Sequence, residues 1–279
     1  MMTTMKTSVE YNVSYSYDNQ VTVNDNVLRV FPPKEFWQNP IDEQVSIQPD
    51  GKIIYYNDRF GNKNARIKIT EPHYRVFYKV ISIVETSPYK VTINDDLKLP
   101  LDKSLFSSDI RIYLNPSTLI NPELILHRAP DIVGQITTLK EALTVLTEWV
   151  TKNIKYVPSS TTIQTKARES LALGVGVCQD KAHILIGFLR SLGIPARYVS
   201  GVLVDTPGAT HAWAEAFWPN VGWIPLDPTH NRSFDLENYY VKYGHGRDYN
   251  DVAPITGYFE SDSPNSLTQL MVIPTIIEK

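Results

Sequence analysis

The spacing of apolar residues changes partway along the chain, and this change constrains the fold more than any other feature of the sequence. Near the N-terminus apolar and polar residues alternate, for example around Val9 and Tyr11, which is the period of a half-buried strand. From Thr138 onward apolar residues recur every three or four positions, which is the period of a helix. We therefore predict an α+β protein with an all-β domain over residues 1–115 and a mixed domain over residues 116–279.

Several short strands are expected in the first domain, with turn residues between them. The turn-forming run of residues 57–62 separates two β-rich segments, residues 53–56 and 65–69. A longer segment rich in β-branched and aromatic residues spans residues 74–84. Short strands joined by such turns are typical of a sandwich, so the predicted N-terminal domain is sandwich-like.

The composition is that of a folded globular protein and excludes several classes of function. Apolar residues make up 42% of the 279 residues and charged residues 20%, which rules out a disordered chain. The formal net charge of −3 does not indicate a nucleic-acid partner or a polybasic membrane-binding surface. No apolar run of about 18 residues could span a bilayer, and the N-terminus lacks an apolar leader region. We therefore expect a cytoplasmic protein without a membrane partner, while the oligomeric state stays open.

The chain contains a single cysteine, Cys178, so it cannot form an intramolecular disulfide or the usual multi-thiolate zinc site. This thiol is therefore either an inert core residue or a chemical reagent. It follows a glycine-rich run and opens a helix predicted over residues 178–192, which is apolar on most sides and ends at Gly193. The N–H groups at a helix start favour the thiolate, which is the nucleophilic form, and they can stabilise an oxyanion.

A histidine and an aspartate lie at the ends of strands that are predicted after this helix. The strands are expected over residues 196–204, 210–218 and 223–226, with a turn over residues 219–222. His211 opens the second strand and Asp227 follows the third, so a hairpin would bring a carboxylate beside an imidazole. Such a carboxylate fixes the tautomer of a catalytic histidine and stabilises its protonated form. Taken singly, both residues also fit structural roles, as a core histidine and as a turn residue.

Four motifs in this region resemble those of the transglutaminase-like superfamily. They are Gly176-Val177-Cys178-Gln179-Asp180-Lys181-Ala182-His183, Gly193-Ile194-Pro195-Ala196-Arg197-Tyr198-Val199-Ser200-Gly201, Thr210-His211-Ala212-Trp213 and Gly222-Trp223-Ile224-Pro225-Leu226-Asp227-Pro228-Thr229. Residues 246–254, and N-terminal motifs such as residues 28–32, resemble the bacterial and archaeal branch, which often has an N-terminal β domain. The resemblance implies a papain-like core, in which a buried nucleophile helix packs on an antiparallel sheet. It also implies a catalytic triad of Cys178, His211 and Asp227.

Other residues of the same region are candidates for weaker roles. We assign substrate binding to Trp213, Trp223 and Asp251, although each also fits a core or loop-anchoring role. His183 lies five positions after Cys178 on the predicted helix, which is about 140° around its axis. We therefore expect a buried structural hydrogen bond from His183 rather than catalysis. The same geometry argues against a zinc site, and we expect neither a metal nor another cofactor.

Two features of the site stay open at this point. The second donor of an oxyanion hole could come from Trp149, Tyr156 or Gln164, which all lie upstream of the cysteine. Lys181 occupies a position where the family motif often has an aromatic residue, so the pocket next to the helix differs from the usual pattern.

These observations predict a cysteine-dependent acyl-transfer enzyme that acts on a peptide or protein substrate. Attack by Cys178 on a carbonyl would give a thioester, which water or an amine resolves. Hydrolysis by a peptidase or amidase is favoured, because cross-linking requires a site that excludes water and admits a second large substrate. A transglutaminase and a non-catalytic binding module with the same fold are the alternatives. The sequence has no EF-hand-type calcium loop, so we expect no calcium dependence.

Overall fold

One long strand organises the N-terminal sheet of the computed structural model, which describes residues 4–94, 98–262 and 265–278. Strand β1 (Met5–Leu28) shows the predicted alternation, since every second side chain from Met5 to Val13 is buried. The first half of β1 pairs with β5 and β16, and the second half pairs with β4 and β15, always antiparallel. The other strands of this seven-stranded sheet are β2 (Gln38–Gln48), β3 (Lys52–Asn57), β4 (Lys63–Ile69), β5 (His73–Thr86), β15 (Ile255–Ser261) and β16 (Ser266–Glu278).

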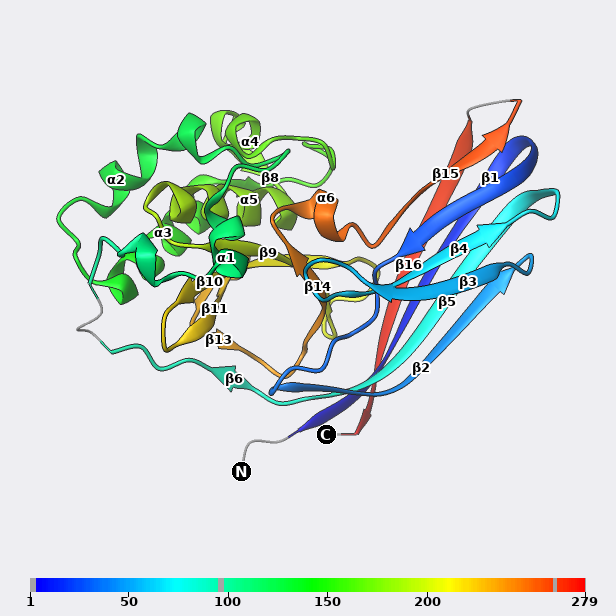
Figure 1. The fold of residues 1–279 in the computed structure, drawn as a ribbon, viewed down its shortest axis with the longest axis horizontal. Helices are drawn as coiled ribbons and strands as arrows, with labels where there is room; N and C mark the ends of the chain where they lie inside the picture. Colours follow the sequence, from blue (N-terminus) through cyan, green and yellow to red (C-terminus); the bar gives the residue numbers. More distant parts are fainter. Residues whose placement is uncertain (1–3, 95–97, 263–264, 279) are drawn as a thin grey trace.

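The N-terminal region is all-β, as predicted, and its long strands lie side by side in one curled sheet (Figure 1). Two strands of this sheet, β15 and β16, come from the C-terminal end of the chain. The predicted division placed residues 255–279 in the second domain, and the pairing of both strands with β1 corrects that part of the division. The reason is physical: alternation of apolar residues identifies a strand but not the sheet that it joins.

A five-stranded antiparallel sheet forms the centre of the second part and contains the strands predicted around His211. In order across the sheet, its strands are β12 (Arg232–Ser233), β11 (Gly222–Asp227), β10 (His211–Trp218), β9 (Ala196–Leu203) and β14 (Tyr240–Gly246). Two short ladders join β6 (Tyr89–Lys90) to β13 (Asp235–Leu236) and β7 (Lys155–Tyr156) to β8 (Val175–Gly176). Strand β10 has two different faces, since Ala212 and Ala214 belong to the core that includes the helix beginning at Cys178, whereas Trp213 belongs to another cluster.

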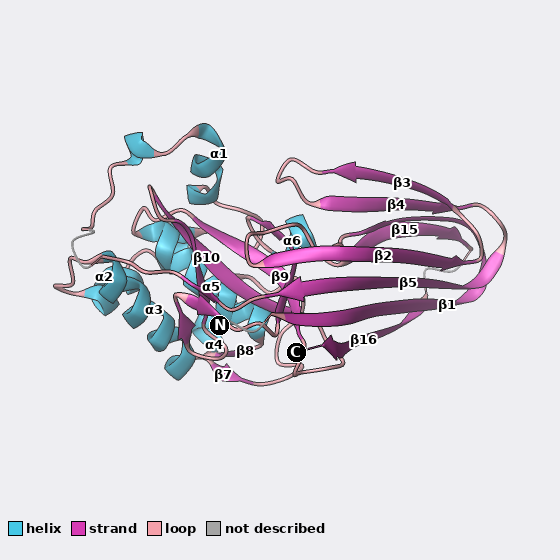
Figure 2. Cartoon of the chain, turned by 90° about the horizontal axis from the view of Figure 1, so that it is seen from below, coloured by secondary structure: helices cyan, strands magenta, loops and turns pink. Residues whose placement is uncertain are grey.

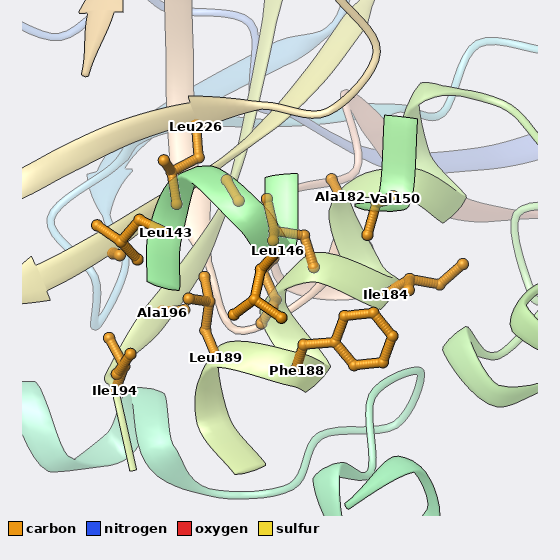
Figure 3. Close-up of a cluster of buried hydrophobic side chains, with 14 of the residues drawn as sticks. Leu143, Leu146, Val150, Ala182, Ile184, Phe188, Leu189, Ile194, Ala196 and Leu226 are labelled. Carbon is orange, nitrogen blue, oxygen red and sulfur yellow. The ribbon is translucent and has the colours of Figure 1, made fainter. Parts of the chain in front are cut away.

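Helix α5 (Cys178–Ser191) is buried from its second residue almost to its end, because apolar residues occupy most of its sides. It packs on β10 and on α3 (Leu139–Asn153). Figure 3 shows Leu146 and Val150 of α3 among the apolar side chains of α5. Thr138 caps α3, since its hydroxyl accepts a hydrogen bond from the N–H of Glu141 at 3.3 Å. The remaining helices are α1 (Ser108–Arg111), α2 (Arg128–Val133), α4 (Ala167–Leu173) and α6 (Tyr249–Val252), with 3₁₀ turns at Lys103–Leu105, Ile112–Leu114 and Pro122–Ile125.

The helices α2 to α5 gather at the end of the molecule away from the long strands (Figure 2). Val202 and Val204, in and just after β9, and Tyr243 of β14 join the apolar core of the N-terminal sheet, so the two parts of the chain pack against each other. Over the described ranges, no helix is long and apolar enough to cross a membrane. The expectation that the N-terminus lacks an apolar leader concerns a stretch whose first three residues, 1–3, lie outside the described residues.

Candidate active site

Cys178 is held at the first position of α5 by the loop that precedes it. The carboxylate of Asp180 accepts hydrogen bonds from the N–H of Val177 at 2.8 Å and from the hydroxyl of Thr161 at 2.6 Å, and so caps the helix. A Cβ at Gly176 would lie 2.5 Å from the Cβ of Asp180, so only glycine permits this close approach. Cys178 itself is half-buried and reduced. The loop therefore leaves the sulfur accessible at a fixed helix start.

His211 and Asp227 lie beside this cysteine, as the sequence predicted. The Nε2 atom of His211 is 2.8 Å from Oδ2 of Asp227, and Cys178 interacts with the same ring and raises its pKa. His211 opens β10, and Asp227 ends the neighbouring strand β11. Since Nε2 faces the carboxylate, Nδ1 is the nitrogen left to interact with the sulfur. The three side chains therefore lie together in the order cysteine, histidine, aspartate.

The carboxylate of Asp227 is buried and surrounded by donors. Its Oδ1 atom accepts the backbone N–H groups of Thr229 at 2.8 Å and of His230 at 3.3 Å. Its Oδ2 atom accepts from His211, from Nδ1 of His230 at 2.8 Å and from the hydroxyl of Tyr240 at 2.7 Å. Burial acts to raise the pKa of Asp227, but the hydrogen bonds from the two histidines outweigh it and hold this pKa well below its usual range. Asp227 is therefore a carboxylate that only accepts hydrogen bonds.

The protonated form of His211 is stabilised by the same contacts. Burial acts to lower the pKa of His211, but its hydrogen bonds to Asp227 and Cys178 outweigh burial and raise this pKa to about 10. The site therefore favours an imidazolium that faces the sulfur on one side and a carboxylate on the other. An imidazolium beside a thiolate is the resting form that a cysteine nucleophile requires.

This charge on His211 predicts a pH-dependent stability. Because folding raises the His211 pKa from 6.5 to about 10, the protonated imidazole stabilises the fold fully below about pH 6.5, and this stabilisation is lost as the pH rises toward 10. We expect the melting temperature of the wild type to fall between about pH 7 and about pH 10 relative to that of His211→Gln. Scanning calorimetry of both proteins measures this, and a difference that stays constant across the range would contradict it.

A pocket of about 330 Å³ opens beside the sulfur and is the space into which a substrate would bind. The residues that line it are Tyr156, Cys178, Leu203, Thr206, Ala209, Thr210, His211, Thr229 and His230. No carboxylate, lysine or arginine is among these described lining residues, so hydroxyl groups and imidazoles supply its polar contacts. Of the three upstream candidates for an oxyanion donor, Tyr156 lines the pocket, whereas the Trp149 ring packs against Phe188.

The three predicted substrate-binding residues do not line this pocket. Trp213 is fully buried, with its ring stacked 6.1 Å from that of His211, so it supports the imidazole from behind. The Trp223 ring lies 3.9 Å below the guanidinium of Arg197, and Asp251 is ion-paired with Arg247. Spacing along a strand indicated the correct face for Trp213, but it does not indicate whether a cavity or packed side chains cover that face.

Two buried residues of α5 have structural roles. His183 accepts a hydrogen bond from the N–H of Tyr249 at 3.1 Å, which is the buried bond expected for it, and burial lowers its pKa to about 4. The ammonium of Lys181 lies 3.3 Å from the carbonyl of Thr151 and 3.5 Å from that of Pro228. Lys181, which stands where the family motif often has an aromatic residue, thus ties α5 to Pro228, the residue that follows Asp227.

Two residues of the site were missed in the sequence. His230 follows Asp227 by three positions, and a carboxylate that ends a strand often bonds to groups in the next turn, so this spacing was an available signal. Tyr240 reaches Asp227 from β14, on the far side of β9, and no local pattern indicates that contact.

His211, Asp227 and His230 also satisfy the geometry of a metal site. One ligand atom from each lies within 4.8 Å of the others. Both imidazoles already bond to the carboxylate through the nitrogen that faces it. These two hydrogen bonds account for the closeness of the three side chains. A metal would have to replace both of these hydrogen bonds.

Comparison with known proteins assigns the chain to a family. Residues 127–228 match the core of the transglutaminase-like superfamily, and residues 7–85 match the bacterial transglutaminase-like N-terminal region. The chain belongs to the transglutaminase-like superfamily, which confirms the resemblance seen in its motifs. The N-terminal match lies within the long curled sheet, and the core match contains Cys178, His211 and Asp227.

Relatives and a solved structure extend this similarity over nearly the whole chain. The uncharacterized protein Rv2569c of Mycobacterium tuberculosis is 30% identical over 289 residues, which cover 95% of this chain and 90% of that protein. The uncharacterized protein ML0607 of Mycobacterium leprae is 26% identical over 274 residues, covering 95% and 97%. The crystal structure of a candidate cysteine protease from Cytophaga hutchinsonii superimposes with a TM-score of 0.85 at 24% identity, covering 99% of this chain and 92% of that one. The α+β fold predicted from the sequence is thereby confirmed.

Proposed function

We propose that this protein is a cysteine-dependent acyl-transfer enzyme that hydrolyses a peptide or carboxamide bond. The observation that carries the proposal is that Cys178 and His211 line one pocket, while the His211 ring is hydrogen-bonded to the buried carboxylate of Asp227. Membership of the transglutaminase-like superfamily supports cysteine-type chemistry in general. The candidate cysteine protease of similar fold is consistent with hydrolysis.

The mechanism follows from the charges in the site. The thiolate of Cys178 attacks the substrate carbonyl, and the C–N bond breaks as the His211 imidazolium gives its proton to the departing amine. Asp227 keeps the His211 ring in one orientation and stabilises its charge. The first N–H groups of α5, with the hydroxyl of Tyr156 at the pocket wall, are the proposed donors to the oxyanion. The product of this half-reaction is a thioester on Cys178.

Hydrolysis is favoured over cross-linking because solvent has access to the site. The side chain of His230 at the pocket wall is 42% exposed, so water can reach the thioester. We propose a peptide or protein substrate, since the pocket is large enough for one side chain next to the scissile bond. We also propose a cytoplasmic location, because a reactive unpaired thiol persists in a reducing compartment.

A partition experiment distinguishes hydrolysis from transamidation. The acyl donor p-nitrophenyl acetate is supplied with and without an excess of glycinamide, and the products are quantified by mass spectrometry. We expect acetate to remain the main product, because water enters the open pocket and none of its described lining residues is a carboxylate that would bind a cationic amine. The spontaneous reaction without protein serves as the control. N-acetylglycinamide as the main enzymatic product would instead establish the transglutaminase alternative.

A further inference from the structure

One carboxylate oxygen in this site bonds to two imidazoles. Oδ2 of Asp227 lies 2.8 Å from Nε2 of His211 and 2.8 Å from Nδ1 of His230, and the two rings are 5.1 Å apart between centroids. The proposed mechanism uses only the first of these rings. The second ring lines the same pocket as Cys178, and it is 42% exposed where His211 is 8% exposed.

The hydrogen bonds fix the tautomer of the second ring. An ionised carboxylate only accepts hydrogen bonds, so the nitrogen of His230 that faces Asp227 carries a hydrogen. In a neutral ring the other nitrogen, Nε2, is then an acceptor with a free lone pair. Among the described residues of the chain, no hydrogen bond to this Nε2 atom is present. The pocket therefore contains an acceptor beside the cysteine that no protein group uses.

We propose that His230 is a second catalytic base, which binds and deprotonates the water molecule that hydrolyses the thioester on Cys178. Because both rings line the same pocket as Cys178 and bond to the same carboxylate oxygen, a water molecule in that pocket lies within reach of the acyl group and of His230. This assignment rests on the proposed hydrolytic function. It gives each of the two protons of the attacking water its own acceptor.

The proton balance of this step explains why two bases are useful. After acylation, His211 is neutral because its proton has left with the amine. As the water oxygen bonds to the acyl carbon, one water proton moves to Nε2 of His230, which is half-exposed and releases the proton to solvent. The C–S bond then breaks and leaves a thiolate on Cys178 and a carboxylic acid that carries the second water proton. His211 accepts this second proton, which restores the thiolate–imidazolium pair, and the product leaves as a carboxylate.

Two substitutions separate this role from a merely supporting one. In His230→Asn the amide nitrogen can reproduce the Nδ1–H bond to Asp227, but no group remains at the Nε2 position. In His230→Gln the amide reaches the Nε2 position, but the bond to Asp227 is lost. If His230 acted only by holding Asp227, asparagine would preserve both half-reactions. If it acts on water, asparagine preserves acylation and slows deacylation.

The test is burst kinetics with p-nitrophenyl acetate, with acetylation of Cys178 followed by mass spectrometry. For His230→Asn we expect an acylation burst close to that of the wild type and deacylation slowed about 100-fold, the lower range for loss of a general base. We expect slower acylation in His230→Gln. Deacylation of His230→Asn at the wild-type rate, or equal slowing of both steps, would overturn the assignment to His230. If wild-type Cys178 acquires no acetyl group, the proposed function itself fails, and the assignment fails with it.

Discussion

Cys178→Ala should lower kcat for ester and amide substrates by about 10⁶-fold, the loss typical of removing the nucleophile from a catalytic triad. The variant cannot form the thioester, and His211 loses the partner that receives and returns its proton. The fold should survive, because Cys178 is half-buried and the cap of α5 depends on Asp180 instead. Turnover of p-nitrophenyl acetate, together with the melting temperature, separates lost chemistry from lost structure.

The same residue permits an independent check by alkylation. Because the chain has one cysteine, every carbamidomethyl group added by iodoacetamide lies on Cys178. We expect the native protein at neutral pH to be labelled faster than the same protein unfolded in urea, because a helix start and a neighbouring cationic imidazole are the surroundings in which cysteines react fastest. The unfolded chain serves as the matched control. Slower labelling of the native protein, or full activity of Cys178→Ala, would mean that the thiol is only structural.

The parts of the site that could be predicted from sequence depend on local rules. A buried helix with a stop at Gly193 and a hairpin with its turn before Gly222 are both specified by residues within a few positions. These elements bring together Cys178, His211 and Asp227, so their proximity follows once the helix packs on the sheet. The alanines of β10 reinforce that packing, because small side chains allow the helix to approach closely.

The rest of the site and fold depends on contacts between distant segments. Tyr240 reaches Asp227 only because β14 is placed beside β9, and strand order is not encoded in the periodicity of either strand. The same limit applies to β15 and β16, because nothing within their sequences specifies which sheet they join. Trp223 was predicted at the pocket, but Arg197 covers its ring, and nothing near Trp223 in the sequence indicates that partner.

Asp227→Asn should lower kcat by about 10⁴-fold, because it replaces the carboxylate that accepts a hydrogen bond from His211 with an amide that donates one. The amide N–H₂ of the variant would point at Nε2 of His211 and leave the hydrogen on Nδ1, the nitrogen that faces the sulfur. A neutral ring in that tautomer cannot accept the proton of the thiol. We further expect a loss of about 1–3 kcal/mol in unfolding free energy, since the buried donors around Oδ2 lose a charged acceptor.

A matched variant separates these two effects of Asp227→Asn. Asp248 is equally buried, at 2% exposed, and its carboxylate accepts backbone N–H groups of Leu119 and Asn250 at 2.9 Å each, away from the pocket. Asp248→Asn should therefore lower the unfolding free energy measured in urea to a similar extent and leave kcat near the wild-type value. If both variants retain wild-type kcat, Asp227 only stabilises the fold. If Asp227→Asn alone loses kcat, its carboxylate acts on the tautomer of His211, because equal losses of stability cannot account for unequal losses of rate.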